Sequence, residues 1–138
     1  AGAAFVAALA AAIDRHQPAL VALAGFMRIL TPAFVAHYED RLLNIHPSLL
    51  PAFPGVDAQQ QALQHGVKVT GATVHLVTGE LDAGPIIVQA CVPVLESDTV
   101  ATLSARILVE EHRLYPEAVG MVLGGRWRVD GRRFTITD

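Results

Sequence analysis

The sequence predicts an α/β protein in which helices flank a mixed β-sheet. A strand–helix–strand pattern near the N-terminus predicts parallel pairing, and two β-rich segments joined by a short link predict antiparallel pairing. A long amphipathic segment near the C-terminus predicts a helix with one apolar face. The chain has 138 residues, of which 52% are hydrophobic, so we expect one domain over residues 1–138.

The predicted crossover occupies the first third of the chain. Apolar residues spaced four apart predict a helix over residues 3–16, and a continuous apolar run predicts a buried strand over residues 20–24. Thr31 followed by proline is typical of a helix start, which predicts a second helix over residues 31–38. Another buried strand is expected over residues 41–45. Because a helix separates them, these two strands should be parallel.

The rest of the chain divides at proline and glycine residues. The segment His46–Gly55 contains three prolines, which predicts a stiff loop rather than a helix or a central strand. The link over residues 79–84 is too short for a parallel crossover, so the strands that it joins should be antiparallel. The remaining predicted elements are a helix over residues 57–65, strands over 67–78 and 85–94, a helix from Asp98-Thr99 to about Leu123, and a hairpin that turns at Asp130-Gly131.

Composition and charge exclude several classes of function. A net charge of −3 does not provide the basic face that nucleic acid requires, and no apolar run reaches the roughly 20 residues that span a membrane. Cys91 is the single cysteine, which excludes an internal disulfide and indicates a reducing compartment such as the cytoplasm. The six histidines show no metal-ligand spacing, so we expect no metal.

The start of the chain and its apolar composition predict contact with further protein. The chain begins at Ala1 without methionine and without a capping residue, as though inside a helix, and we interpret it as a fragment or a processed product. Its apolar start lacks the basic leader of a signal peptide. A mean hydropathy of +0.41 predicts that some apolar surface meets a second copy of the chain or a missing N-terminal segment.

Candidate catalytic residues gather at the end of the second predicted strand. Asn44 and His46 are two residues apart, so they point to the same side of the strand, at the end where ligands bind in open α/β sheets. Asp82 lies in a turn bracketed by two glycines, which can bring its backbone close to a ligand. Each has a plain structural alternative, because histidine occurs in cores and aspartate in turns. His75 lies on a predicted strand, where we expect a core or supporting role.

Several segments of the chain resemble the folate-dependent formyltransferases. Residues 44–51 read NIHPSLLP, and Asp82 follows within LDAGPII at residues 81–87. Further similar segments are AGFMRIL at residues 24–30, GATVH at 71–75 and EEHRLYP at 110–116. The similarity runs from the first helix to the last hairpin. It is greatest to the branch that formylates glycinamide ribonucleotide in purine biosynthesis.

This resemblance implies both a fold and a reaction. The fold would be the C-terminal part of a mostly parallel, Rossmann-like open sheet. The reaction would transfer a formyl group from 10-formyltetrahydrofolate to the amino group of glycinamide ribonucleotide, with Asn44, His46 and Asp82 as catalytic residues. Asn44 and protonated His46 would stabilise a tetrahedral oxyanion. Asp82 would keep His46 charged and help to move the proton of the amine.

The resemblance also assigns binding residues. The formyl donor would lie among apolar side chains and a few backbone groups, although ordinary packing also explains the segment at residues 27–30. Glu111 would accept hydrogen bonds from the ribose hydroxyls, and the Leu50–Pro51 peptide bond would be cis. The residues expected at the donor are Met27, Arg28, Ile29, Leu30, Val77, Thr78 and Asp82. Those expected at the ribonucleotide are Gly25, Met27, Ile45, Pro47 and Glu111.

Departures from the family pattern leave other hypotheses open. No glycine-rich phosphate-binding loop precedes Ala1, and Gln59 stands where relatives often have histidine. The alternative enzyme is a 10-formyltetrahydrofolate hydrolase, a family that tends to have a second histidine where Pro47 stands. A tRNA formyltransferase would require a nucleic-acid-binding domain. A further hypothesis is a half-domain that binds folate or a partner without catalysis.

Overall fold

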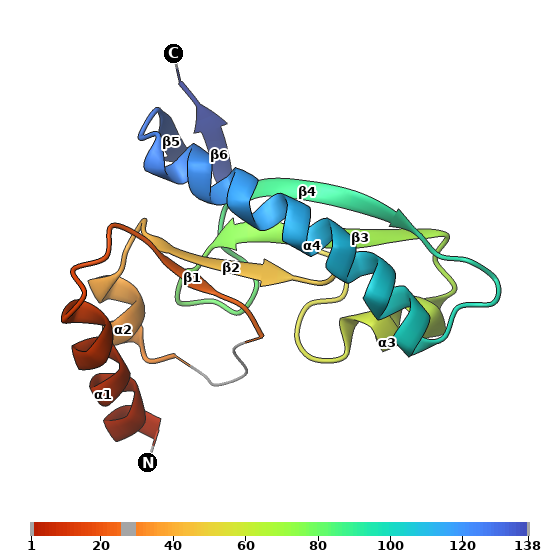
Figure 1. The fold of residues 1–138 in the computed structure, drawn as a ribbon, viewed down its shortest axis with the longest axis horizontal. Helices are drawn as coiled ribbons and strands as arrows, with labels where there is room; N and C mark the ends of the chain where they lie inside the picture. Colours follow the sequence, from red (N-terminus) through yellow and green to blue (C-terminus); the bar gives the residue numbers. More distant parts are fainter. Residues whose placement is uncertain (1, 26–29, 138) are drawn as a thin grey trace.

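The computed structural model describes residues 2–25 and 30–137, which form a six-stranded sheet flanked by helices (Figure 1). The strands lie in the order β1-β2-β3-β4-β6-β5. The elements in chain order are α1 (Gly2–Asp14), β1 (Val21–Leu23), α2 (Pro32–His37), β2 (Leu42–His46), α3 (Ala58–His65), β3 (Val69–Leu76), β4 (Ile86–Pro93), α4 (Val100–Leu123), β5 (Trp127–Asp130) and β6 (Arg133–Ile136).

The sheet is mixed, as the sequence predicts. β1 and β2 are parallel across the α2 crossover, and β3 and β4 are antiparallel across the short link. However, β2 and β3 are also antiparallel, and so are β5 and β6. Parallel pairs are therefore a minority among the described strands, contrary to the mostly parallel sheet that we expected. Because the α3 connection between β2 and β3 is long, the sequence leaves their relative direction open.

Helix ends form where the capping residues predict them. The Oγ1 atom of Thr31 accepts from the N–H of Phe34 at the start of α2. Thr99 and Thr102 form a capping box at the start of α4. Gly66 ends α3 in the left-handed region at φ 70°, which favours glycine. Local sequence thus fixes these boundaries.

The C-terminal hairpin turns one residue later than expected. Asp130 pairs with Arg133, so the turn residues are Gly131 and Arg132 rather than Asp130 and Gly131. Gly131 has a φ of 61°, and a two-residue hairpin turn accommodates glycine at its first position. The hairpin joins the sheet through one parallel bridge between Arg133 and Ile86 at the start of β4.

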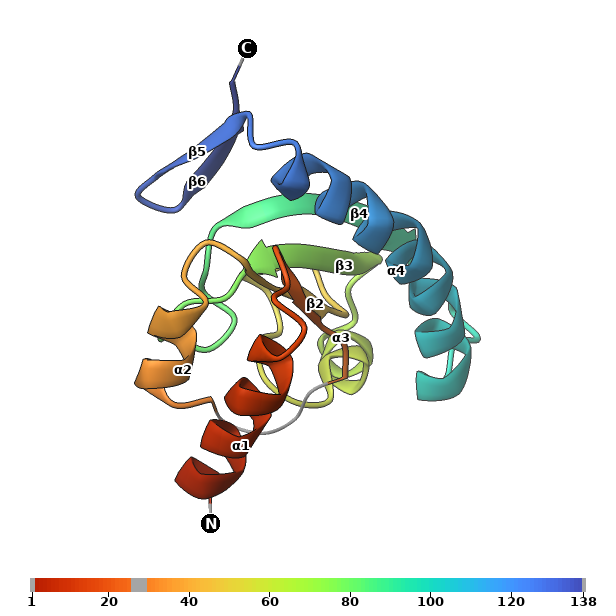
Figure 2. The same cartoon turned by 60° about the vertical axis from the view of Figure 1, so that its left-hand side comes forward.

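The sheet separates two hydrophobic clusters. Figure 2 shows α4 on one side of the sheet and α1 and α2 on the other. Successive residues of a strand face opposite sides, so Leu43 packs in the α4 cluster while Leu42 packs in the α1–α2 cluster. The members of the α4 cluster include Ile45, Val74, Leu103, Ile107 and Leu114, and those of the α1–α2 cluster include Val6, Phe34 and Tyr38. The face of β2 that carries Leu42 also carries Asn44 and His46.

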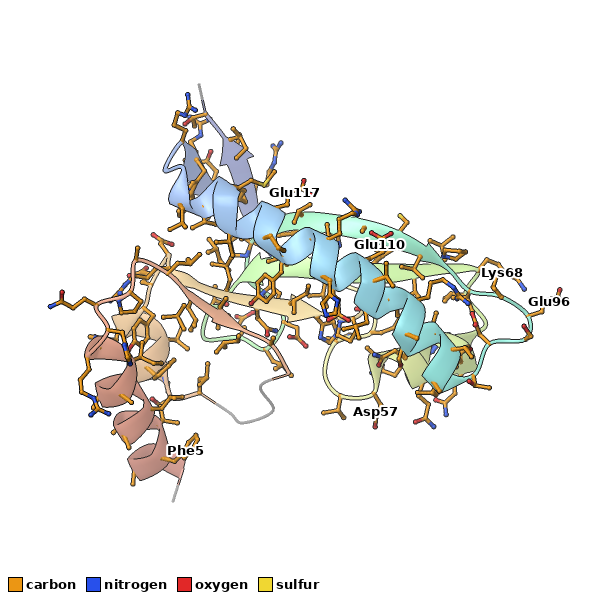
Figure 3. The ribbon with its side chains drawn as sticks, viewed as in Figure 1. Phe5, Asp57, Lys68, Glu96, Glu110 and Glu117 are labelled. Carbon is orange, nitrogen blue, oxygen red and sulfur yellow. The ribbon has the colours of Figure 1, made fainter. Side chains whose placement is uncertain are left out.

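Charged side chains line the outside of the molecule. On α4, Arg113 forms ion pairs with Glu110 and Glu117, both of which Figure 3 labels. Figure 3 also shows Lys68 and Glu96 at the edge of the molecule, in the connections at one end of the sheet. In the described part of the chain, no helix has the length and apolar character to cross a membrane.

Candidate functional site

A stripe of polar side chains crosses β2 and β3 on the side opposite α4. In the antiparallel register, Asn44 lies opposite His75 and His46 lies opposite Thr73. Ile45, between the two β2 residues, points instead into the α4 cluster. Asn44 Nδ2 is 3.4 Å from His75 Nε2, so the amide and the imidazole are in direct contact. The strand alternation inferred from the sequence thus brings these side chains together.

Asp82 reaches this stripe from the link between β3 and β4. Its Oδ2 atom is 3.5 Å from His46 Nδ1, and its Oδ1 atom is 3.8 Å from His75 Nε2. The three side chains are 3–7% exposed. The backbone N–H of Gly55 donates to Asp82 Oδ2 at 2.8 Å, which compensates part of the cost of burying a carboxylate. The structure therefore brings together all three predicted catalytic residues and adds His75.

Both ring nitrogens of His46 face oxygen acceptors. Nε2 lies 2.8 Å from the carbonyl oxygen of Phe53, which can only accept, so this nitrogen carries a hydrogen. Nδ1 faces the Asp82 carboxylate. A doubly protonated ring has a donor for each acceptor, whereas a neutral ring has only one. His46 is therefore held between an acceptor from the proline loop and the carboxylate of Asp82.

The proline loop that supplies these backbone groups is tied to the sheet by side chains that the sequence analysis missed. Thr73 Oγ1 donates to the carbonyl oxygen of Ser48 at 2.7 Å and accepts from the N–H of Leu50 at 3.1 Å. Gln89 donates to the Leu50 carbonyl at 2.9 Å. The Leu50–Pro51 bond is cis, as the resemblance implied. The sequence does contain one indication of the role of Thr73: it lies two residues before His75 and therefore on the same face of that strand.

A pocket of about 330 Å³ lies on the other side of β2, beside α4. Two residues expected at the ribonucleotide, Ile45 and Glu111, line it. Burial raises the pKa of the Glu111 carboxyl, while His112 and His46 act in the opposite direction. The other lining residues are Ala24, Leu108, His112, Tyr115 and Pro116.

Two other residues expected at the ribonucleotide, Gly25 and Pro47, are close in sequence to residues that line this pocket. Gly25 follows the lining residue Ala24, and Pro47 follows His46 and is half-buried. The phenol of Tyr115 donates to the carbonyl oxygens of Leu23 and Leu43, which ties α4 to the ends of β1 and β2. Hydrogen bonds from the Tyr115 side chain to two main-chain carbonyls thus fix one wall of the pocket.

Residues expected at the formyl donor are partly assembled. Leu30 and Val77 both pack against the α1–α2 cluster, whereas Thr78 is exposed. Met27, Arg28 and Ile29 lie outside the described residues. Asp82 also lines a second pocket of about 230 Å³, whose other lining residues are Leu50, Pro51, Gly84, Ile86 and Arg132. Over residues 2–25 and 30–137, no group of three or more His, Cys, Asp or Glu side chains has the arrangement of a metal site.

Comparisons with known proteins give a consistent result. The family described as formyl transferase matches residues 2–119. The chain is 52% identical over 120 residues to the phosphoribosylglycinamide formyltransferase of Escherichia coli, covering 87% of this chain and 54% of that protein. The crystal structure of glycinamide ribonucleotide transformylase 1 from Symbiobacterium toebii superposes with a TM-score of 0.97 and 56% identity. That match covers all of this chain and 65% of that one.

A hydrolytic enzyme is also among the similar structures. A formyltetrahydrofolate deformylase from Pseudomonas syringae superposes with a TM-score of 0.90 and 35% identity, covering 96% of this chain and 45% of that one. Its identity to this chain is lower than that of the transformylase. The chain spans 54–63% of the length of the bacterial phosphoribosylglycinamide formyltransferases that it matches.

Proposed function

Because this chain belongs to the formyl transferase family, we propose that it carries the catalytic centre for transfer of a formyl group from 10-formyltetrahydrofolate to glycinamide ribonucleotide. The observation that carries this proposal is the buried Asp82 carboxylate between His46 and His75, beside the amide of Asn44. This arrangement combines hydrogen-bond donors with a proton acceptor, which acyl transfer to an amine requires.

Asn44 and His46 stabilise the charge that develops when the amine attacks. A new bond forms between the amine nitrogen and the formyl carbon, and the formyl oxygen becomes an oxyanion. The Asn44 amide supplies an N–H donor to this oxygen. The positive charge of protonated His46, whose two ring nitrogens face the Phe53 carbonyl and the Asp82 carboxylate, stabilises the oxyanion electrostatically. One such donor is typically worth about 10²–10³ in rate.

Asp82 moves the proton that the reaction must relocate. The attacking nitrogen loses a proton, and N10 of tetrahydrofolate gains one as its bond to the formyl carbon breaks. The Asp82 carboxylate accepts the first proton directly or through a water and returns it to the leaving nitrogen. Nδ1 of His46 is the ring nitrogen that faces Asp82, because Nε2 is held by the Phe53 carbonyl. All atoms balance without a covalent enzyme intermediate.

The two substrates would approach the site from different sides of β2. We assign the ribonucleotide to the pocket lined by Ile45 and Glu111, with contacts from Gly25, Met27 and Pro47. Glu111 accepts from ribose hydroxyls there. For the donor we assign Leu30, Val77, Thr78 and Asp82, together with Met27, Arg28 and Ile29.

Hydrolysis of 10-formyltetrahydrofolate is the competing activity, because water can replace the amine at the same centre. The higher identity to the transformylase structure favours transfer over hydrolysis. The single cysteine Cys91 is free and exposed, which fits a reducing compartment, and we place the reaction in the cytoplasm.

The test measures product formation from 10-formyltetrahydrofolate with and without glycinamide ribonucleotide. We expect formylated ribonucleotide only when both are present. Because the chain spans about half of its E. coli relative, the assay is run on the chain alone and on the chain joined to the unmatched part of that relative. Donor loss that does not depend on ribonucleotide would indicate a hydrolase. Folate binding without any turnover in either form would indicate a non-catalytic role.

A further inference from the structure

His75 is held in one tautomer by the backbone beside it. Its Nδ1 atom lies 3.0 Å from the carbonyl oxygen of Leu76, and a carbonyl can only accept. Nδ1 therefore carries the hydrogen. A neutral imidazole has one N–H, so Nε2 is left as a bare acceptor.

The surroundings of His75 keep the ring neutral. Burial lowers the pKa of His75, with the charge of His46 acting in the same direction, while the Leu76 carbonyl and the Asp82 carboxylate oppose this shift. Asp82 and His46 are the charged or titratable groups that face the ring, from the β3–β4 link and from β2 respectively. The net effect favours the neutral ring with an acceptor at Nε2.

A bare Nε2 distinguishes the two ends of the Asn44 amide. Nδ2 of Asn44 lies 3.4 Å from this nitrogen, so an amide N–H donates to it. The reversed amide would instead place its carbonyl oxygen against the nitrogen lone pair, which is repulsive. Asn44 and His75 are directly paired across β2 and β3, so the backbone fixes the contact. Over residues 2–25 and 30–137, no other hydrogen bond to the Asn44 side chain is present.

We propose that His75 is a positioning residue that fixes the Asn44 amide with one N–H on Nε2 and the second N–H available to the reacting oxygen. This inference rests on the proposed function for the role of that second N–H, although the contact itself does not. Asn44 is then a preorganised donor, which costs no reorientation during the reaction.

Protonation of His75 should reverse this preference. A second proton on Nε2 turns the acceptor into a donor, which then faces Asp82 Oδ1 at 3.8 Å. The cationic ring cannot accept from Asn44, and its new N–H attracts the amide carbonyl instead. The amide would turn its NH₂ group away from His75, and the arrangement that aims the second N–H would be lost at acid pH.

The first test is ¹⁵N NMR of the histidine ring nitrogens in the purified chain without substrates. We expect His75 to show a protonated Nδ1 and a bare Nε2 at neutral pH. We expect slow exchange of the Asn44 NH₂ protons, faster exchange in His75→Phe, and slow exchange restored in His75→Gln, whose amide oxygen is an acceptor. His37→Gln is the matched control, because His37 is exposed and pairs with Asp14. A protonated Nε2 with a bare Nδ1, or unchanged Asn44 exchange in His75→Phe, would overturn the proposal.

The second test compares kcat and KM for formyl transfer. His75→Phe should lower kcat by at least about tenfold, up to the roughly 10²–10³ that one lost donor costs, with little change in KM. His75→Gln should recover part of this loss. A purely structural role would give no recovery by His75→Gln, and that result would refute positioning. If the unaltered protein shows the expected tautomer but transfers no formyl group, the proposed function fails while the His75–Asn44 contact stands.

Discussion

Gly84→Ala should disturb the candidate site, because Gly84 ends the link between β3 and β4 that carries Asp82. A Cβ atom at Gly84 would lie 1.7 Å from the carbonyl oxygen of Leu76 and 2.8 Å from its carbon. Real Cβ atoms do not approach closer than 3.0 Å, so the two backbone segments must move apart by at least about 1.3 Å. The displaced carbonyl is the one that accepts from His75 Nδ1.

The cost of this displacement can be worked from two contributions. Forcing extra volume into a packed site costs about 1–3 kcal/mol. The backbone hydrogen bond from Leu76 N–H to the Pro85 carbonyl, 2.9 Å long, lies in the same strained segment, and its loss adds about 1 kcal/mol. We therefore expect Gly84→Ala to lower the free energy of unfolding by about 2–4 kcal/mol.

Gly79→Ala is the matched control, because it changes the other glycine of the same link. A Cβ at Gly79 meets nothing within 4 Å, so this variant should be neutral or more stable by about 0.4–1 kcal/mol. Urea unfolding followed by the fluorescence of Trp127, the single tryptophan, measures both variants. If Gly84→Ala unfolds with the free energy of the unaltered chain, or if both variants lose the same amount, the inferred close approach is wrong.

Three further predictions concern α4 and the residues around it. Burial raises the pKa of Glu111, so the ionised carboxylate destabilises the folded chain once the pH rises above the ordinary pKa of a glutamate. Glu111→Gln should therefore have a higher urea midpoint than the unaltered chain at pH 7 and the same midpoint at pH 4. Equal midpoints at pH 7 would contradict this. The bidentate pair with Arg106 holds the pKa of Asp98 well below its ordinary value, so the free energy of unfolding should fall as the pH drops below about 4. In Asp98→Asn, the free energy of unfolding should depend less on pH in this range. Tyr115→Phe removes the donor that β1 and β2 share, and should cost about 0.5–1.5 kcal/mol in urea unfolding; no loss would mean that this tie to the sheet is dispensable.

Local sequence patterns predicted much of the fold. The alternation of side chains predicted that Asn44 and His46 share one face of β2. The cap at Thr31 predicted α2, and the short link after β3 predicted the antiparallel pairing of β3 and β4. These features depend on a few neighbouring residues, which is why the sequence shows them. The direction of β3 relative to β2 depends on packing around α3, and no local signal gives it.

The partners of the candidate catalytic residues could not be read from the sequence. Phe53 and Gly55 act through backbone groups, which carry no residue-type signal, and their positions depend on the path of the proline loop. That path is fixed by Thr73 and Gln89, which lie on strands well beyond the loop in the chain. His75 was visible only as a strand histidine, because its contact with Asn44 requires the strand register.

The rate of formyl transfer by Asp82→Asn tests most directly whether Asp82 moves the proton. The asparagine is isosteric and still accepts from the Gly55 N–H, so the link should keep its position while the charge beside His46 is removed. We predict a decrease of roughly 10²–10⁴ in kcat, the range for a lost acid–base group. A kcat within about tenfold of the unaltered protein, short of that range, would contradict the assignment of Asp82 to the proton transfer.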